Sequence, residues 1–154
     1  MLSASAWAEQ AVYAQLSSLA NQLGPNVKTV AMEKVDELHG LGHSSDQVVI
    51  KTSGAYFVMA AAQMGSGKSE QPNGYIDLWL VKNGDRISNS NTRQSIDTKH
   101  STSVLISQAV IHLEKGDKIS AGFFANKSSL GLISTPATND EPAIPSIIFS
   151  IFKI

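Results

Sequence analysis

The stretch Ala55-Tyr56-Phe57-Val58-Met59-Ala60 is apolar at every position, and Ile147-Ile148-Phe149-Ser150-Ile151-Phe152 is apolar at nearly every position. Tyr75-Ile76-Asp77-Leu78-Trp79-Leu80-Val81 has the same character. Because successive side chains of a strand point to opposite faces, a strand with one wet face alternates apolar and polar residues. A strand that is apolar on both sides must have both faces covered. These stretches therefore decide the fold, and they predict that something packs on the outside of a sheet.

The chain after Pro25 is typical of an all-β protein. Short runs rich in Val, Ile, Phe and Tyr alternate with clusters of Gly, Asn, Asp and Ser, which indicates a sandwich or barrel. Asn83-Gly84 and Gly116-Asp117 are tight-turn signals. The expected strands are Lys28–Val35, Gln47–Lys51, Ala55–Gln63, Tyr75–Lys82, Ser103–Leu113, Lys118–Asn126, Gly131–Ser134 and Ser146–Lys153.

The chain before Pro25 has a different pattern. Residues Ser5 to Leu23 contain no Pro or Gly, and their apolar residues recur at heptad spacings of four, three and four: Val12, Leu16, Leu19 and Leu23. This spacing predicts an α-helix that ends at Gly24-Pro25. We interpret residues 1–24 as a short trimeric coiled-coil neck, or as a helix lying on its own domain. The β domain then occupies residues 25–154.

Composition excludes several classes of protein. The chain has 154 residues, a net charge of −1 and no Cys, and 16% of its residues are charged. The length suits one domain with a hydrophobic core large enough to be stable without disulfides or a structural metal. A near-neutral chain lacks the basic face of a nucleic-acid binder, and no apolar run is long enough for a spanning helix, so we expect neither nucleic acid nor membrane insertion. The absence of Cys excludes disulfides and thiol catalysis.

Three motifs resemble the complement C1q domain. Gly54-Ala55-Tyr56-Phe57-Val58 is similar to its Gly-x-Tyr-x-Phe strand, with Val58 in place of the last Phe. Leu78-Trp79-Leu80-Val81-Lys82-Asn83-Gly84 is similar to its strand ending in Lys-Asn-Gly. Val110 to Ile119 resembles its Leu-x-x-Gly-Asp-x-Val corner. The resemblance covers residues 27–154, but the family's aromatic residues before the Gly-x-Tyr strand are missing and no collagen-like Gly-x-y repeat precedes the domain.

The resemblance implies the tumour necrosis factor (TNF)/C1q jelly roll, an antiparallel two-sheet sandwich that assembles as a compact homotrimer. Other copies of the chain would then cover the second apolar face; the alternative is that the N-terminal helix covers it. We expect the following residues to lie in the core or the trimer interface: Tyr56, Phe57, Trp79, Phe149 and Phe152, with Leu16, Leu19 and Leu23 of the neck.

Catalytic and metal motifs are weak. Gly65-Ser66-Gly67-Lys68-Ser69 looks like the end of a phosphate-binding loop, but Ala62 stands where the pattern needs Gly and a strand follows, which favours a flexible hairpin loop. His39 and His43 flank a Gly-rich segment that reads as a loop, and no Asp or Glu completes a three-ligand set. We therefore assign no catalytic residue, no metal ligand and no cofactor. Calcium sites occur in some relatives, but no residue here is assigned to one.

The polar segment 86–103 contains both arginines of the chain, Arg86 and Arg93. Arginine suits bidentate recognition of carboxylates, so this segment is a candidate ligand patch; the alternative is a solvated strand and loop.

The sequence thus favours a non-enzymatic homotrimeric recognition head that acts by multivalency on a protein or glycan ligand. Two alternatives remain: a secreted cytokine-like receptor ligand, and a jelly-roll metal-dependent enzyme. The resemblance favours an extracellular or cell-surface location, whereas the lack of a recognisable signal peptide leaves the cytoplasm open.

Overall fold

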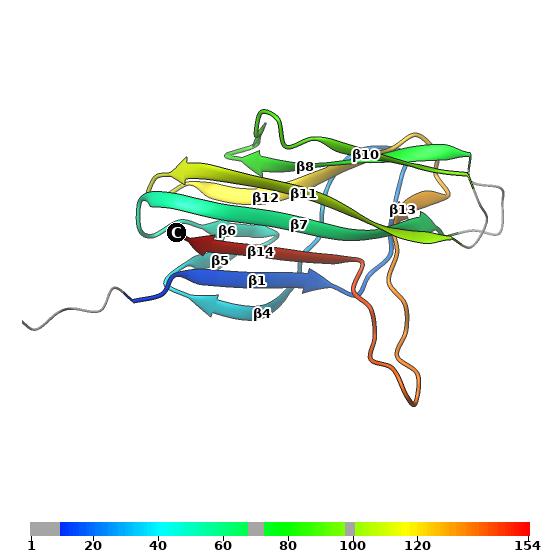
Figure 1. Cartoon of the computed structure of the whole chain (residues 1–154), viewed down its shortest axis with the longest axis horizontal. Helices are drawn as coiled ribbons and strands as arrows, with labels where there is room; N and C mark the ends of the chain where they lie inside the picture. The colour runs from blue at the N-terminus through cyan, green and yellow to red at the C-terminus, as the bar shows by residue number, and fades with distance from the viewer. Residues whose placement is uncertain (1–9, 68–72, 98–100) are drawn as a thin grey trace, which may run out of the picture.

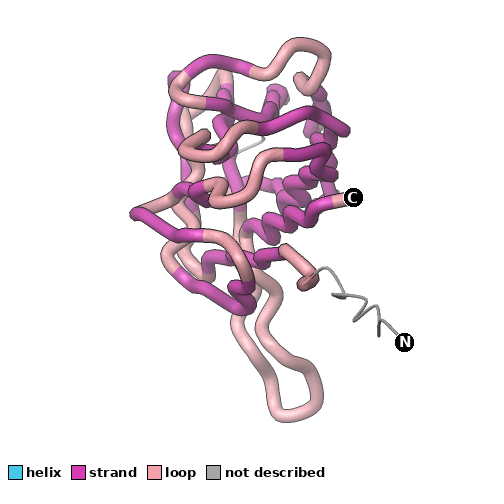
Figure 2. Tube along the Cα trace, turned by 90° about the vertical axis from the view of Figure 1, so that its left-hand side faces the viewer, coloured by secondary structure: helices cyan, strands magenta, loops and turns pink. Residues whose placement is uncertain are grey.

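The computed structural model describes residues 10–67, 73–97 and 101–154, and within these ranges it contains strands and loops but no helix (Figures 1 and 2). The first sheet holds β1 (Tyr13–Ser18), β2 (Gln22–Leu23), β4 (Lys34–His39), β7 (Gly54–Ser66), β11 (Thr102–Leu113), β13 (Leu130–Leu132) and β14 (Ile147–Lys153). The second sheet holds β3 (Asn26–Thr29), β5 (Gly42–Ser44), β6 (Gln47–Val49), β8 (Gly74–Lys82), β9 (Asp85–Arg86), β10 (Thr92–Ile96) and β12 (Lys118–Ala125). Within the described residues no helix could span a membrane.

Every strand pairing is antiparallel. The first sheet has the order β2-β13-β7-β14-β1-β4, and β11 pairs with the other edge of β7. The second sheet has the order β10-β8-β12-β6-β5, with β3 on β12 and β9 on β8. The predicted all-β antiparallel two-sheet sandwich is confirmed.

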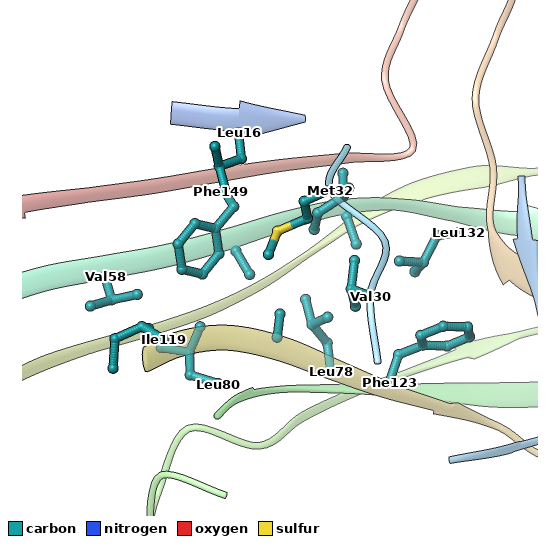
Figure 3. Close-up of a cluster of buried hydrophobic side chains, with 14 of the residues drawn as sticks. Leu16, Val30, Met32, Val58, Leu78, Leu80, Ile119, Phe123, Leu132 and Phe149 are labelled. Carbon is teal, nitrogen blue, oxygen red and sulfur yellow. The ribbon is translucent and has the colours of Figure 1, made fainter. Parts of the chain in front are cut away.

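The core fills the space between the two sheets. Figure 3 shows Leu16, Phe149 and Val58 of the first sheet facing Leu78, Leu80, Ile119 and Phe123 of the second. All of these side chains are fully buried. β7 and β14 supply every second residue to this layer, as the pleat requires.

The prediction of an N-terminal helix is wrong for the residues that the structure describes. Residues 13–18 form β1, which pairs with β14 on one side and β4 on the other, and residues 22–23 form β2. The heptad spacing misleads because Ala14 and Leu16, which are buried, are two apart, as in a strand. The pairing energy of a central strand overrides helix propensity. The predicted neck therefore belongs to the sandwich from residue 13 onward; residues 1–9 lie outside the described residues.

Three smaller expectations also change. The predicted strand Lys28–Val35 is divided, because the buried Val30 and Met32 link β3 to β4 as the chain crosses between sheets. His39 and His43 lie in β4 and β5 rather than in a loop. The phosphate-loop-like segment does not close a hairpin, because β7 and β8 belong to different sheets. Its residues Lys68 and Ser69 lie outside the described residues.

Two turns that carry the family resemblance bind each other. Asn83 and Gly84 have φ values of 52° and 86°, which fits the tight turn between β8 and β9. The Asn83 amide donates to Asp117 Oδ1 at 2.9 Å, and Asn83 Oδ1 accepts from the Lys118 amide at 2.8 Å. Asp117 Oδ2 accepts from the Glu114 amide and lies 3.3 Å from Lys82 Nζ. The Lys-Asn-Gly and Gly-Asp motifs therefore build one corner of the sandwich.

The reassignment of β1 predicts opposite outcomes for two leucines of the supposed heptad seam. Leu16→Ala should lower the free energy of unfolding by about 2–5 kcal/mol, because it leaves a cavity at a fully buried position. Leu19→Ala should change it by less than about 0.5 kcal/mol, because Leu19 is 49% exposed. Urea denaturation at one protein concentration measures both. Equal, large losses of unfolding free energy in both variants would support the helical heptad seam and contradict the assignment of β1.

The Asp117 corner predicts a pH dependence. Hydrogen bonds hold the pKa of Asp117 below its ordinary value, and the bond from the Glu114 backbone amide has the largest effect. The corner therefore stabilises the fold above about pH 4, and this contribution falls as pH drops through that region. Asp117→Asn should lose about 1–2 kcal/mol of unfolding free energy at pH 7 and less at pH 3. The control is Asp85→Asn, which alters an exposed acid directly after the Asn83-Gly84 turn of this corner. A loss in Asp117→Asn that does not change with pH would contradict the account.

Candidate functional site

The outward face of the first sheet is apolar across its central strands. We call the following residues the apolar face: Val104, Ile106 and Val110 of β11, Phe57, Met59 and Ala61 of β7, Ile148 and Phe152 of β14, and Tyr13 of β1. Val110 is 68% exposed and Val104 62% exposed, although both are aliphatic. At the outward positions of β1, β7, β11 and β14 there is no Asp, Glu, Lys or Arg.

One row of this face runs straight across the sheet. Val110 lies opposite Phe57, Phe57 opposite Phe152, Phe152 opposite Tyr13, and Tyr13 opposite His39. The rings of Phe57 and Phe152 have centroids 5.3 Å apart, and the Tyr13 ring stacks on His39 at 5.4 Å. A continuous row of rings on an open sheet face is unusual for a surface that stays in contact with water, which makes this face the candidate interaction site.

The structure distributes the predicted core and interface residues over three places. Tyr56, Phe149 and Leu16 are buried between the sheets, whereas Phe57 and Phe152 point outward onto the apolar face. Trp79 is also buried, at 4% exposure, but on the outer side of the second sheet under Arg86. Leu19 is exposed after β1, and Leu23 is half-buried in β2.

The two predicted patch arginines both lie on the outer side of the second sheet, but they are used differently. Arg93 forms a bidentate pair with Asp77 at 2.6 and 2.9 Å, and its guanidinium lies 3.9 Å from the centre of the Tyr75 ring. The hydrogen bond to Asp77 raises the pKa of Arg93. Asp77 is only 7% exposed, so Arg93 neutralises a nearly buried carboxylate. Arg93 therefore has a structural partner already.

Arg86 lies over Trp79 instead. Its guanidinium carbon is 4.4 Å from the indole centre, and none of the described carboxylates forms an ion pair with it. The indole lies against Gly122, where a Cβ would come within 2.5 Å of Nε1. The position of the Trp79 ring therefore requires glycine at residue 122, since any side chain there would collide with the indole. Arg86 also contacts the Trp79 ring.

Two hollows open beside Arg86. One, of about 470 Å³, lies between the β8–β9 turn and β11 and reaches Val110 of the apolar face. The other, of about 390 Å³, lies on the outer side of the second sheet around Trp79. Arg86 lines both, so it is the functional candidate of the two arginines.

The described residues hold no group of three or more His, Asp or Glu side chains that could bind a metal. His112 is exposed and lies 2.9 Å from Glu114. His39 forms hydrogen bonds with the Ala11 carbonyl oxygen and the Gln10 side chain, which precede β1. Asp140 and Glu141 lie in the long segment 133–146, which extends away from the sandwich in Figures 1 and 2.

Sequence reasoning missed Tyr13, Ile106 and Val110 of the apolar face. Tyr13 had been assigned to a helix, whereas Ile106 and Val110 alternate with the buried Leu105 and the partly buried Ala109 and Ile111. The available signal was that segment 104–111 is apolar in both phases of the alternation, as in the quoted stretches. Asp77 was also missed, although an acid inside an apolar strand indicates a cationic partner.

This geometry is that of the TNF/C1q-like jelly roll, so the predicted resemblance is confirmed at the level of the fold. The crystal structure of murine APRIL at pH 8.5, which has the TNF jelly roll, superposes with a TM-score of 0.62 and 14% identity. The structure of murine APRIL at pH 5.0 gives 0.63 and 16%. Both comparisons cover 94% of this chain and 99% of the other. No protein-family model matches the sequence, and no curated protein sequence is significantly similar to it.

The different partners of the two arginines predict different effects on stability. Arg93→Gln should lower the melting temperature clearly, because it leaves the Asp77 carboxylate nearly buried and unpaired. Arg86→Gln should lower it less, because none of the carboxylates in the described part of the chain pairs with Arg86. Thermal unfolding followed by circular dichroism compares them. A larger loss for Arg86→Gln would reverse the assignment of structural and available arginine.

Proposed function

We propose that this chain is one subunit of a homotrimeric, non-enzymatic recognition head that acts outside the cell or at its surface. The observation that carries the proposal is the apolar face. Its occupant is two further copies of the same chain, in the arrangement that the TNF/C1q jelly roll implies.

The energetics support a covered face. Burial of apolar surface stabilises by about 25 cal/mol per Å². The exposed side chains Val104, Ile106, Val110, Phe152 and Tyr13 are each at least 40% exposed in one subunit. Leaving them in water would favour aggregation. An interface that is apolar at its centre and carries aromatic anchors is what obligate association requires.

Charge supports a self-complementary arrangement. The centre of the face carries no Asp, Glu, Lys or Arg, so three copies can meet there without burying an unpaired charge. The polar residues Gln108, Ser150 and Gln15 form the next row, and their side chains can donate and accept between subunits. The charged residues Lys34 and Glu37 lie at the edge strand β4, where water reaches them.

A recognition role follows from the outer side of the second sheet. In the proposed trimer, this side points away from the apolar face, so three identical outer surfaces are held in fixed geometry. Fixed spacing raises avidity well above single-site affinity. The second candidate, a receptor ligand of the cytokine type, is supported by the similarity to murine APRIL, a TNF-family cytokine. Those neighbours are not enzymes, which also supports a binding role.

Charge placed in the apolar face should prevent assembly. Val110→Glu and Phe152→Glu each bring three carboxylates into the proposed interface, so we expect the mass to fall from three times 16.4 kDa to that of one chain. Val27→Glu is the matched control, because Val27 is 58% exposed on the other sheet. Light scattering after size-exclusion chromatography measures all three. Trimeric Val110→Glu and Phe152→Glu would contradict the interface.

The recognition role is tested by binding to a glycan array and to an array of receptor ectodomains. The labelled wild-type trimer and the Val110→Glu monomer are applied at equal chain concentration. If the trimer binds and the monomer binds at least tenfold more weakly, the result supports a multivalent head. Binding only to receptor ectodomains would favour the cytokine-like alternative, and binding to neither array would contradict both.

A further inference from the structure

The hollow of about 390 Å³ on the outer side of the second sheet has the composition of a ligand site. Trp79 and Ser120 border the hollow but are only 4% and 2% exposed. The other lining residues that the argument uses are Thr29, Gln47, Arg86 and Gly122. The alternation that buries Ile119, Ala121 and Phe123 turns Ser120 and Gly122 outward. Thr29 lies opposite Gly122 in the ladder, so it shares this side of the sheet. The volume is in the range of small-molecule sites, about 300–1,000 Å³.

Arg86 is the cation of this hollow. It is exposed, its guanidinium is held 4.4 Å from the Trp79 ring centre, and no described carboxylate pairs with it. The contact with the ring restricts where the guanidinium can lie, and the exposed Arg86 side chain keeps access to solvent. A planar fork held in this way is preorganised for two parallel hydrogen bonds to an oxyanion. Arg93, by contrast, already donates two hydrogen bonds from its guanidinium group to Asp77.

The surroundings favour an anion over a neutral or cationic ligand. None of the residues that line the hollow is Asp or Glu. Lys28 also lines it, but its ammonium donates to the Leu23 carbonyl oxygen. The local charge is therefore positive in a chain whose net charge is −1.

The other groups favour a sugar as the body of that anion. The Thr29 hydroxyl and the Gln47 amide group can both donate and accept hydrogen bonds, which matches the hydroxyl groups of a pyranose ring. Val27 and Val81 border them with apolar surface for the carbon skeleton. We infer that this hollow binds a carboxylate-bearing sugar, with the carboxylate on Arg86 and the ring hydroxyls on Thr29 and Gln47.

This inference rests on the proposed recognition role and names its ligand class. Because the hollow lies on the opposite side of the sandwich from the apolar face, it stays open in the proposed trimer. Three copies in fixed geometry would let a weak single site hold a polyvalent acidic glycan firmly.

The test is a titration of the full-length protein with glucuronate, glucose and glutamate, followed by the indole N–H signal of Trp79 in ¹H–¹⁵N spectra. The chain has two Trp residues, and Trp7→Phe assigns the signals. We expect glucuronate to shift the Trp79 signal saturably. Glucose, which lacks the carboxylate, and glutamate, which lacks the ring, should bind at least tenfold more weakly. Added salt should weaken the binding of glucuronate.

Variants connect binding to Arg86. Arg86→Gln should weaken glucuronate binding at least tenfold, and Arg86→Lys should weaken it less, because it keeps the charge but loses the planar fork. Lys115→Gln, which removes an exposed charge outside the hollow, should leave the affinity unchanged. No binding of glucuronate, equal binding of glucose or glutamate, or full affinity in Arg86→Gln would each overturn the inference.

Failure here differs from failure of the proposed function. A trimeric sample that ignores glucuronate overturns this inference alone. A monomeric sample that binds glucuronate through Arg86 supports it, while the proposed trimer fails.

Discussion

The structure depends on the fact that β7, at the centre of the first sheet, is apolar on both faces. Its inward side chains, such as Tyr56 and Val58, pack against the second sheet, and its outward side chains, such as Phe57 and Met59, extend the apolar face. Hydrophobic burial is non-directional, so it needs only a partner of matching shape. The second sheet occupies one side. In the proposed trimer, two further copies of the chain cover the other side.

The two outer surfaces of the sandwich are accordingly different in chemistry. The first sheet presents rings and aliphatic side chains with uncharged polar groups between them. The second presents arginines stacked on aromatic rings, Arg93 over Tyr75 and Arg86 over Trp79. A stacked guanidinium shields an aromatic surface from water and still offers charge at the edge. This combination suits a surface that must be soluble and selective at once.

Much of the fold could be predicted from the sequence because its strongest signals are local. Two-sided apolar runs identified β7, β8 and β14, and Asn83-Gly84 identified a turn whose positive φ values few other residues adopt. β1 could not be predicted in this way, because its spacing also fits a helix and only its pairing with β14 and β4 decides the matter. Arg86 and Arg93 were found by residue type alone, but their different roles depend on Asp77 and Trp79, which the chain brings to them through sheet register.

Sedimentation equilibrium of the unmodified chain at micromolar concentrations tests the central claim most directly, since the claim is that one subunit leaves its apolar face uncovered. The account predicts a single species of three times 16.4 kDa that persists on dilution and in high salt, because burial of apolar surface is not screened by ions. A soluble species of 16.4 kDa that stays monomeric over the same range would contradict it.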